Sequence, residues 1–229
     1  ERQARLEQEQ QTRLEPEQEQ KLIAEIEQKK ARIIADADRE KELIETQAEV
    51  GYKTLTYKIC VFGNSRVGKT TLIDRYLTNT FHNDLKSTLG ATIHVKKYDL
   101  ENGKITLQVW DFGGEEKFRF LIKPYFQGSA GGVFAFDLTN YESLINMVEW
   151  VPEFKKICRD APIIMAGCKL DLEKERICQK EEALDLLNAY NLNNYIECSS
   201  KTGENSEAVF RGLLMEILKN AGHTHLNLN

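Results

Sequence analysis

The sequence predicts an α/β fold in which a mixed, mostly parallel six-stranded sheet carries helices on both faces. Two observations support this prediction. From residue 132 to residue 220, short apolar runs alternate with helical patterns, which is typical of parallel strands joined by crossover helices. Earlier in the chain, Asn102-Gly103 separates two strand-like runs and is a strong signal for a two-residue hairpin, and therefore for one antiparallel pair.

The elements can be assigned in chain order from apolar periodicity. The first strand is expected at 57–62, and the hairpin pairs 91–100 with 104–110. Later strands are expected at 132–138, 163–166 and 195–198, and helices at 141–158, 180–190 and 204–220. Pro152 lies inside the first of these helices, which it is expected to kink or shorten because proline lacks an N–H donor.

The first strand leads directly into a glycine-containing turn, Gly63-Asn64-Ser65-Arg66-Val67-Gly68-Lys69-Thr70, and a helical pattern follows. This context matches a phosphate-binding loop, because glycines let backbone N–H groups wrap phosphates at a helix N-terminus. Lys69 supplies a cation for the outer phosphates, and the Thr70 hydroxyl is a hard oxygen ligand suited to Mg²⁺. The loop predicts a nucleoside triphosphate without saying which one.

Three further loops follow apolar runs: Asp111-Phe112-Gly113-Gly114, Cys168-Lys169-Leu170-Asp171 and Ser199-Ser200-Lys201. An acidic residue at a strand end can hold a metal's water, and a glycine can bring its N–H close to a terminal phosphate. Over residues 55–221 this succession resembles the Ras superfamily of small GTPases, most closely its Rab and Ras-like branches. The resemblance implies a P-loop NTPase G domain that binds GTP or GDP with Mg²⁺ and hydrolyses GTP.

The resemblance also implies a role for each matching residue. Asp171 matches the carboxylate that accepts from the guanine N1–H and 2-amino group, and Phe81 matches the aromatic residue against the base. The implied nucleotide contacts are Gly63, Asn64, Ser65, Arg66, Val67, Gly68, Lys69, Thr70, Thr71, Phe81, Thr88, Gly114, Cys168, Lys169, Asp171, Ser199, Ser200 and Lys201. The implied metal ligands are Thr70, Thr88 and Asp111, and the implied catalytic residues are Glu115, Lys69, Thr88 and Gly114.

Three positions depart from the family pattern. Cys168 replaces an asparagine that bonds the purine N7; because a thiol is a weak hydrogen-bonding group, we expect lower affinity with guanine selectivity retained. Glu115 replaces the glutamine that orients the attacking water, so hydrolysis is expected to be slow. Arg66 stands where many relatives have glycine. We favour a side chain that points to solvent, and the alternative is a cation that acts on the transition state.

Residues 1–50 have a different character, with 14 acidic and nine basic side chains. After Pro16, apolar residues recur at intervals of four and seven, in an eleven-residue repeat that favours straight or slightly right-handed helix pairing. They are Leu22, Ile26, Ile33, Ala37, Ile44 and Ala48. We therefore expect a long helix that ends near Gly51. A homodimeric coiled coil through residues 16–50 is favoured, and the alternatives are docking on the G domain and an exposed lever.

The chain thus divides into an N-terminal extension at 1–50, a G domain at 55–221 and a tail at 222–229. Effector and regulator proteins are expected to bind residues 85–95 and 112–126.

Charges in the G domain balance, which argues against a nucleic-acid partner. Five cysteines without zinc spacing favour a reduced, cytoplasmic protein, and no prenylation motif is seen, so we expect no intrinsic membrane anchor. The alternative function is a coiled-coil scaffold or adaptor whose G domain is nucleotide-locked or inactive.

Overall fold

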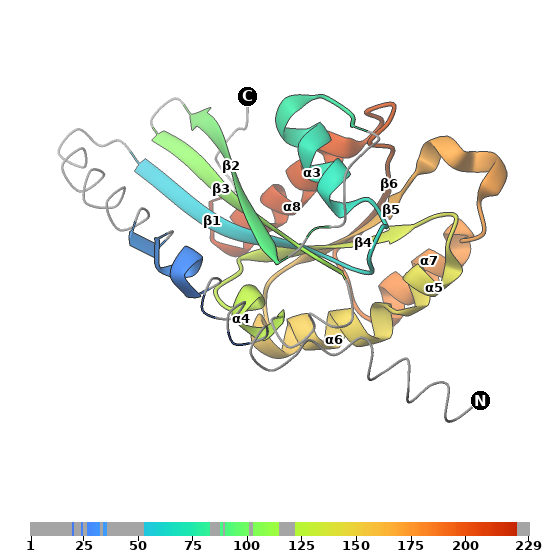
Figure 1. Cartoon of the computed structure of the whole chain (residues 1–229), viewed down its shortest axis with the longest axis horizontal. Helices are drawn as coiled ribbons and strands as arrows, with labels where there is room; N and C mark the ends of the chain where they lie inside the picture. The colour runs from blue at the N-terminus through green and yellow to red at the C-terminus, as the bar shows by residue number, and fades with distance from the viewer. Residues whose placement is uncertain are drawn as a thin grey trace.

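The computed structural model describes residues 20, 24, 27–32, 34–35, 53–82, 88, 90–100, 103–114 and 122–223 (Figure 1). Within these ranges, one six-stranded sheet runs in the order β2-β3-β1-β4-β5-β6. Its strands are β1 (Lys53–Phe62), β2 (Ala91–Leu100), β3 (Gly103–Phe112), β4 (Gly131–Asp137), β5 (Ile163–Cys168) and β6 (Asn194–Glu197). The predicted fold class is therefore confirmed.

The sheet is mixed, as the sequence predicts. Strands β2 and β3 pair antiparallel along their whole length, from Ala91 opposite Phe112 to Leu100 opposite Gly103. All the other neighbouring strands are parallel. Every residue of β4 and β5 is buried, which explains their continuous apolar runs, because both faces of central parallel strands are covered. The hairpin turn itself lies outside the described residues.

Helices cover both faces of the sheet, as Figure 1 shows. Helices α3 and α8 pack on one face around an aliphatic core, whereas α4 to α7 pack on the other around an aromatic-rich core. The helices are α3 (Lys69–Thr78), α4 (Ile122–Phe126), α5 (Tyr141–Ile145), α6 (Met147–Ile157), the 3₁₀ helix η3 (Leu170–Glu175), α7 (Lys180–Ala189) and α8 (Ser206–Asn220). This arrangement brings the carboxyl ends of β1, β4, β5 and β6 to one edge of the sheet.

The helix predicted at 141–158 is divided, but not by its proline. The break between α5 and α6 falls at Asn146, which is both the C-cap residue of α5 and the N-cap residue of α6. Helix α6 continues through Pro152 to Ile157, so the prediction that this proline shortens the helix is wrong. Pro152 is exposed, and the carbonyl that loses its donor can therefore turn to water.

The predicted N-terminal helix can be compared with the structure at only ten residues. The ten described residues before β1 are helical, and the rest of residues 1–52 lies outside the described part of the chain. A continuous helix from Pro16 to Gly51 therefore stays a prediction. The same holds for the C-terminal tail beyond His223.

Candidate functional site

The loop between β1 and α3 has the backbone conformation that a phosphate-binding loop requires. Gly63, Arg66 and Gly68 all have positive φ angles, of 136°, 63° and 104°. A Cβ atom at Gly63 would lie 2.1 Å from the Ala135 carbonyl oxygen, so only glycine fits there. Helix α3 begins directly after Gly68 without a side-chain cap. The N–H groups of its first turn therefore remain open to an anion.

Lys69 is the buried cation of this loop. Its side chain is 6% exposed, and Nζ donates to the carbonyl oxygens of Gly63, at 3.0 Å, and of Asn64, at 2.6 Å. Burial lowers the pKa of Lys69 to about 8, although the charge of Asp111 opposes this shift. An incoming phosphate would supply the negative charge that the ammonium lacks here.

Three oxygen-bearing side chains meet beside Lys69. The Thr70 hydroxyl donates to Asp111 Oδ2 at 2.6 Å and lies 2.7 Å from the Thr88 hydroxyl. Asp111 is fully buried, and its Oδ1 has no hydrogen-bond partner among the described residues. Burial raises the pKa of Asp111, while the Thr70 hydroxyl and Lys69 oppose that shift. A buried carboxylate oxygen with spare acceptor capacity, next to two hydroxyls, fits a hard cation such as Mg²⁺.

The loops after β5 and β6 bring a second set of polar groups together. Ser199 Oγ donates to Asp171 Oδ1 at 2.6 Å, and Lys201 Nζ lies 3.9 Å from Asp171 Oδ2. The backbone of Lys169 is left-handed, with φ 66°, and its ammonium pairs with Asp137 Oδ2 at 2.5 Å. The contacts from Ser199 and Lys201 hold the Asp171 carboxylate in place, and Asp171 lines the cavity.

Cys168 lies between the two ends of the site. Its side chain is 2% exposed, yet it lines the cavity, and a Cβ atom on Gly68 would come within 3.9 Å of the Cys168 Cβ. On its other side it contacts the fully buried Cys198, whose pKa is raised well above its usual value by the hydrogen bond to Cys168 and by burial. The position therefore presents sulfur where the family presents an amide.

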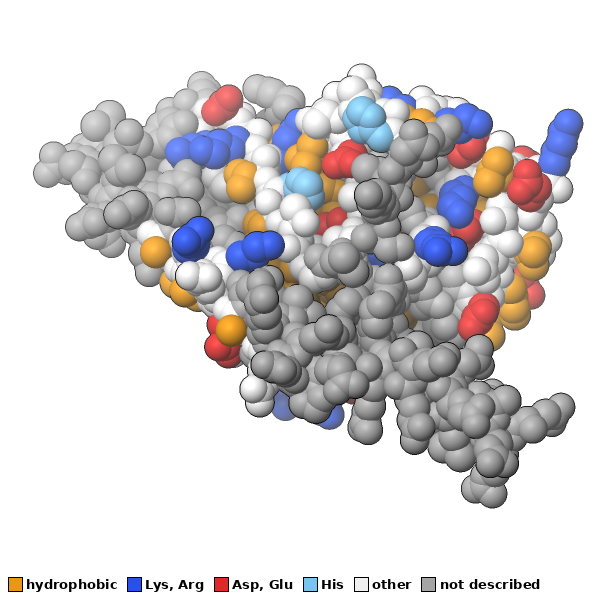
Figure 2. Space-filling view, in the orientation of Figure 1, with side chains coloured by type: hydrophobic (Ala, Val, Ile, Leu, Met, Phe, Trp, Pro, Cys, Tyr) orange, Lys and Arg blue, Asp and Glu red, His pale blue; other side chains and the backbone are white. Residues whose placement is uncertain are grey.

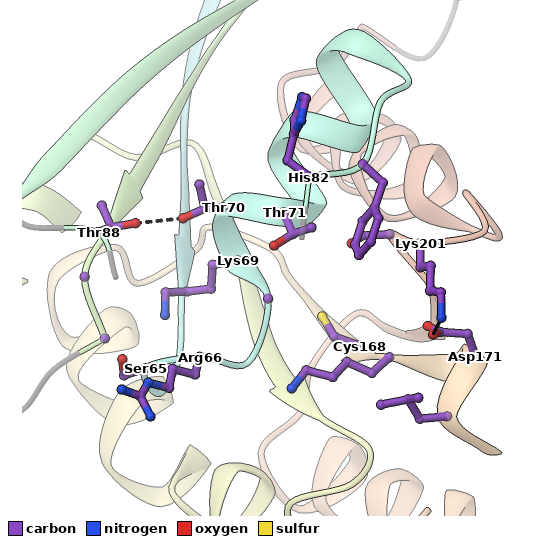
Figure 3. Close-up of a pocket in the computed structure, with 17 residues that line it drawn as sticks. Ser65, Arg66, Lys69, Thr70, Thr71, His82, Thr88, Cys168, Asp171 and Lys201 are labelled. Atoms are coloured by element: carbon purple, nitrogen blue, oxygen red, sulfur yellow. Dashed lines mark hydrogen bonds and ion pairs between the residues drawn. The ribbon is translucent and has the colours of Figure 1, made fainter. Parts of the chain in front are cut away.

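One cavity of about 620 Å³ joins the phosphate loop to the Asp171 loop (Figure 3). In Figure 3, Lys69, Thr70 and Thr88 lie at one end, and Cys168 and Asp171 at the other. The predicted contacts that line it are Ser65, Arg66, Gly68, Lys69, Thr70, Thr71, Phe81, Thr88, Gly114, Cys168, Lys169, Asp171, Ser200 and Lys201. A cavity of this size is within the usual range for small-molecule sites.

Four predicted contacts do not line the cavity but support residues that do. Gly63 and Asn64 accept from Lys69 through their carbonyl oxygens, Val67 packs into the aliphatic core, and Ser199 holds Asp171. The Asn64 side chain has a role that the sequence did not reveal: its Oδ1 accepts from Trp150 Nε1 at 2.9 Å, which ties the loop to α6.

Three residues that the sequence analysis did not select also line the cavity: His82, Gly113 and Leu172. All three adjoin predicted positions in the sequence, so a wider window around each motif would have included them. Glu115 and residues 116–121 lie outside the described residues, as do residues 83–87 and Leu89. Their predicted roles stay predictions.

Gly114 approaches the phosphate loop closely. A Cβ atom there would come within 2.3 Å of the Gly63 carbonyl oxygen and 2.5 Å of the Ser65 nitrogen. Both are backbone atoms, so a larger residue would force the two loops apart. The approach of the Gly114 N–H to a terminal phosphate stays a prediction.

The chain matches the model of the Ras family over residues 58–219. It belongs to the Ras family. It is 33% identical over 174 residues to the Ras-related protein Rab-13 of Bos taurus, which covers 76% of this chain and 85% of the relative. It is 36% identical over 155 residues to the GTP-binding nuclear protein GSP1 of Encephalitozoon cuniculi, covering 67% and 72%. The Ras-related protein RABC1 of Arabidopsis thaliana is 33% identical over 166 residues, covering 71% and 77%.

Membership of the Ras family places the chain among GTP-binding switch GTPases. Proteins of this family bind GTP or GDP, typically with Mg²⁺, and interact with effectors and regulators. Among the described residues, no helix of this Ras-family chain is long and apolar enough to cross a membrane. No cluster of three or more His, Cys, Asp or Glu side chains suited to a metal ion occurs among those residues either.

Proposed function

We propose that this Ras-family protein is a guanine-nucleotide-dependent switch that binds GTP and GDP with Mg²⁺ and hydrolyses GTP slowly. The single observation that carries the proposal is the continuous cavity. The phosphate loop and Lys69 line one end of this cavity, and the carboxylate of Asp171 lines the other. A phosphate chain and a purine base are the two ends of a nucleotide.

Asp171 is assigned to read the base. Its carboxylate can accept from both the N1–H and the 2-amino group of guanine, whereas adenine offers no such pair of donors. Ser199 and Lys201 hold the carboxylate in position, and Lys169 and Phe81 line the same cavity. The thiol of Cys168 contributes less than an amide would, by about 1 kcal/mol for one lost hydrogen bond.

Thr70, Thr88 and Asp111 are assigned to hold Mg²⁺. When bound, the ion would neutralise charge on the outer phosphates. Within the protein, the unpaired Oδ1 of Asp111 provides the buried negative oxygen for this site, and Lys69 and the N-terminus of α3 bind the phosphates themselves.

Catalysis is assigned mainly to positioning. Lys69, Thr88 and the Gly114 N–H would orient and stabilise the terminal phosphate, while Glu115 would face the attacking water. A carboxylate accepts from water but cannot donate, and it adds negative charge beside an anionic phosphate. Since charge neutralisation dominates phosphoryl transfer, hydrolysis should be slow.

The loops around residues 85–95 and 112–126 are assigned as nucleotide-dependent partner surfaces, because the γ-phosphate would order them and its loss would release them. The five cysteines are all free, which supports a reducing cytoplasmic location.

Nucleotide content tests the proposal. The purified protein is denatured, the released nucleotide is identified by chromatography, and GTP-loaded protein is then followed by phosphate release. We expect near-stoichiometric GDP or GTP and slow release of phosphate. Bound guanine nucleotide that neither exchanges nor hydrolyses would favour the adaptor function instead, and a protein that binds no guanine nucleotide would contradict the proposal.

A further inference from the structure

Several buried polar side chains lie on strands β1 and β3, on the face of the sheet that α4 to α7 cover further along. By strand alternation, Lys58 on β1 and Thr106 and Trp110 on β3 share the face on which α4 to α7 pack. Thr106 is 2% and Trp110 is 6% exposed. The Oγ1 of Thr106 and the Nε1 of Trp110 are enclosed with no hydrogen-bond partner within the part of the chain that the structure describes.

Helix α4 reaches Trp110, but the described helices do not account for the enclosure of Thr106. Helices α5 and α6 pack on β4, and α7 packs on β6. Tyr125 of α4 contacts Trp110 and Phe112, both at the carboxyl end of β3. Thr106 lies four residues before Trp110 on the same face of β3 and is still buried. Some other part of the chain must cover it.

The N-terminal segment reaches this place. Burial lowers the pKa of the Lys58 ammonium, and the positive charge of Lys30 lowers it further, so the two side chains lie within electrostatic range. Lys58 is itself at the edge of the buried surface, with Nζ 3.9 Å from the centre of the Trp110 ring and 2.8 Å from the Gln127 carbonyl oxygen. Figure 1 draws the described part of the segment in blue, on the same side of the sheet as α4.

The exposure of the segment indicates which of its faces is turned inward. Among residues 27–32 and 34–35, Lys30 is partly buried and the others are exposed; Ile34, for example, is 51% exposed. Lys30 lies four residues after Ile26 and three before Ile33, on the line of the apolar repeat. Lys30, the one residue of these two ranges that is not exposed, therefore lies on the helix line that the sequence gives to the apolar repeat.

The connection is long enough for docking within one chain. Residues 38–52 connect Ala37 to the start of β1 and span from about 22 Å as helix to about 50 Å when extended. The stretch of β1 from Lys53 to Lys58 is shorter, at roughly 17 Å.

We propose that residues 22–37 dock on their own G domain, laying Leu22, Ile26, Ile33 and Ala37 on the face of β1 and β3 around Lys58 and Trp110. The docked segment would cover a surface between the two loops expected to bind partners, because Trp110 pairs with Ile93 on β2 and precedes Phe112 by two residues. The inference does not depend on the nature of the nucleotide.

Amide hydrogen exchange of residues 54–58 and 104–110 in the full-length protein tests the docking. Each substitution on the docked face is compared with the same substitution at the neighbouring residue of the same type, which lies off that face. Ile33→Asp places a charge on the docked face and should raise exchange there ten-fold or more, whereas Ile34→Asp should change it less than two-fold. Lys30→Glu replaces repulsion of Lys58 by attraction and should slow exchange about two- to five-fold at low salt, whereas Lys29→Glu should not.

Light scattering at two protein concentrations separates docking within a chain from association between chains. We expect a monomer at both concentrations and the same exchange rates. A dimer, or protection that grows with concentration, would overturn the proposal in favour of the coiled coil. Equal effects of Ile33→Asp and Ile34→Asp, or no effect of either, would overturn it in favour of an exposed segment.

Discussion

Nucleotide affinity is expected to fall as the pH rises from 7 to 9, because phosphates bind the charged form of Lys69. Burial lowers the pKa of this ammonium to about 8 in the nucleotide-free structure. Bound phosphates would raise the pKa of Lys69 again. At a pH where Lys69 of the free protein is deprotonated, nucleotide binding is therefore coupled to the uptake of one proton. The apparent Kd then grows in inverse proportion to the fraction of protein in which Lys69 is protonated. For a pKa of about 8, the increase from pH 7 to pH 9 is about ten-fold, or about 1.4 kcal/mol.

The sign of the effect on folding is the opposite. The folded-state pKa of Lys69 lies below the unfolded value, so the unfolded chain binds more protons between about pH 8 and pH 10.5. The contribution of Lys69 to the stability of the nucleotide-free protein therefore becomes more favourable as the pH rises through that window. A loss of affinity above pH 8 can thus be separated from unfolding.

Titration of the protein with a fluorescent GDP analogue at pH 7, 8 and 9 measures this dependence. Lys69→Met is the control, since methionine keeps the length of the side chain but cannot titrate; its binding should be weaker and nearly independent of pH over this range. An equal slope in both proteins would place the titrating group elsewhere. A Kd of the unaltered protein that stays constant between pH 7 and pH 9 would refute the reasoning.

Three substitutions test other parts of the site. Asp111→Asn removes the buried negative oxygen and should reduce the Mg²⁺-dependent gain in GDP affinity about ten-fold, measured as the ratio of Kd values without and with Mg²⁺; an unchanged ratio would exclude Asp111 from the metal site. Gly63→Ala forces a Cβ against the Ala135 carbonyl and should destabilise the protein by about 3 kcal/mol in urea unfolding, so an unaltered midpoint would contradict the loop geometry. Glu115→Gln should accelerate single-turnover phosphate release about ten-fold when an activating protein is present, and a lower rate would make Glu115 the partner of the water.

Local sequence signals predicted the fold well wherever the structure depends on local rules. Asn102-Gly103 placed the antiparallel pair, and the uninterrupted apolar runs of β4 and β5 indicated strands buried on both faces. The phosphate loop was recognisable because its glycines, lysine and threonine have fixed spacing. Each of these signals lies within a few residues of the structure it specifies.

Features that depend on contacts distant in sequence were missed or misplaced. The break at Asn146 was not predicted, and Pro152 was expected to kink or shorten the helix, because the sequence does not reveal that this proline faces solvent. The bond from Trp150 to Asn64 joins residues on separate elements, and nothing near either one predicts it. Similarly, the apolar repeat of the N-terminal segment indicated that a partner is needed but did not identify which surface provides it.

The proposed function requires that the cavity binds guanine nucleotides through Asp171. Calorimetric titration of nucleotide-free protein with GDP, ADP and xanthosine diphosphate in Mg²⁺ buffer tests it most directly, together with the Asp171→Asn variant. We expect a strong preference for GDP over ADP in the unaltered protein, and a shift toward the xanthosine nucleotide in the variant, because an amide donor suits the 2-oxo group. Equal affinity of the unaltered protein for GDP and ADP would contradict it.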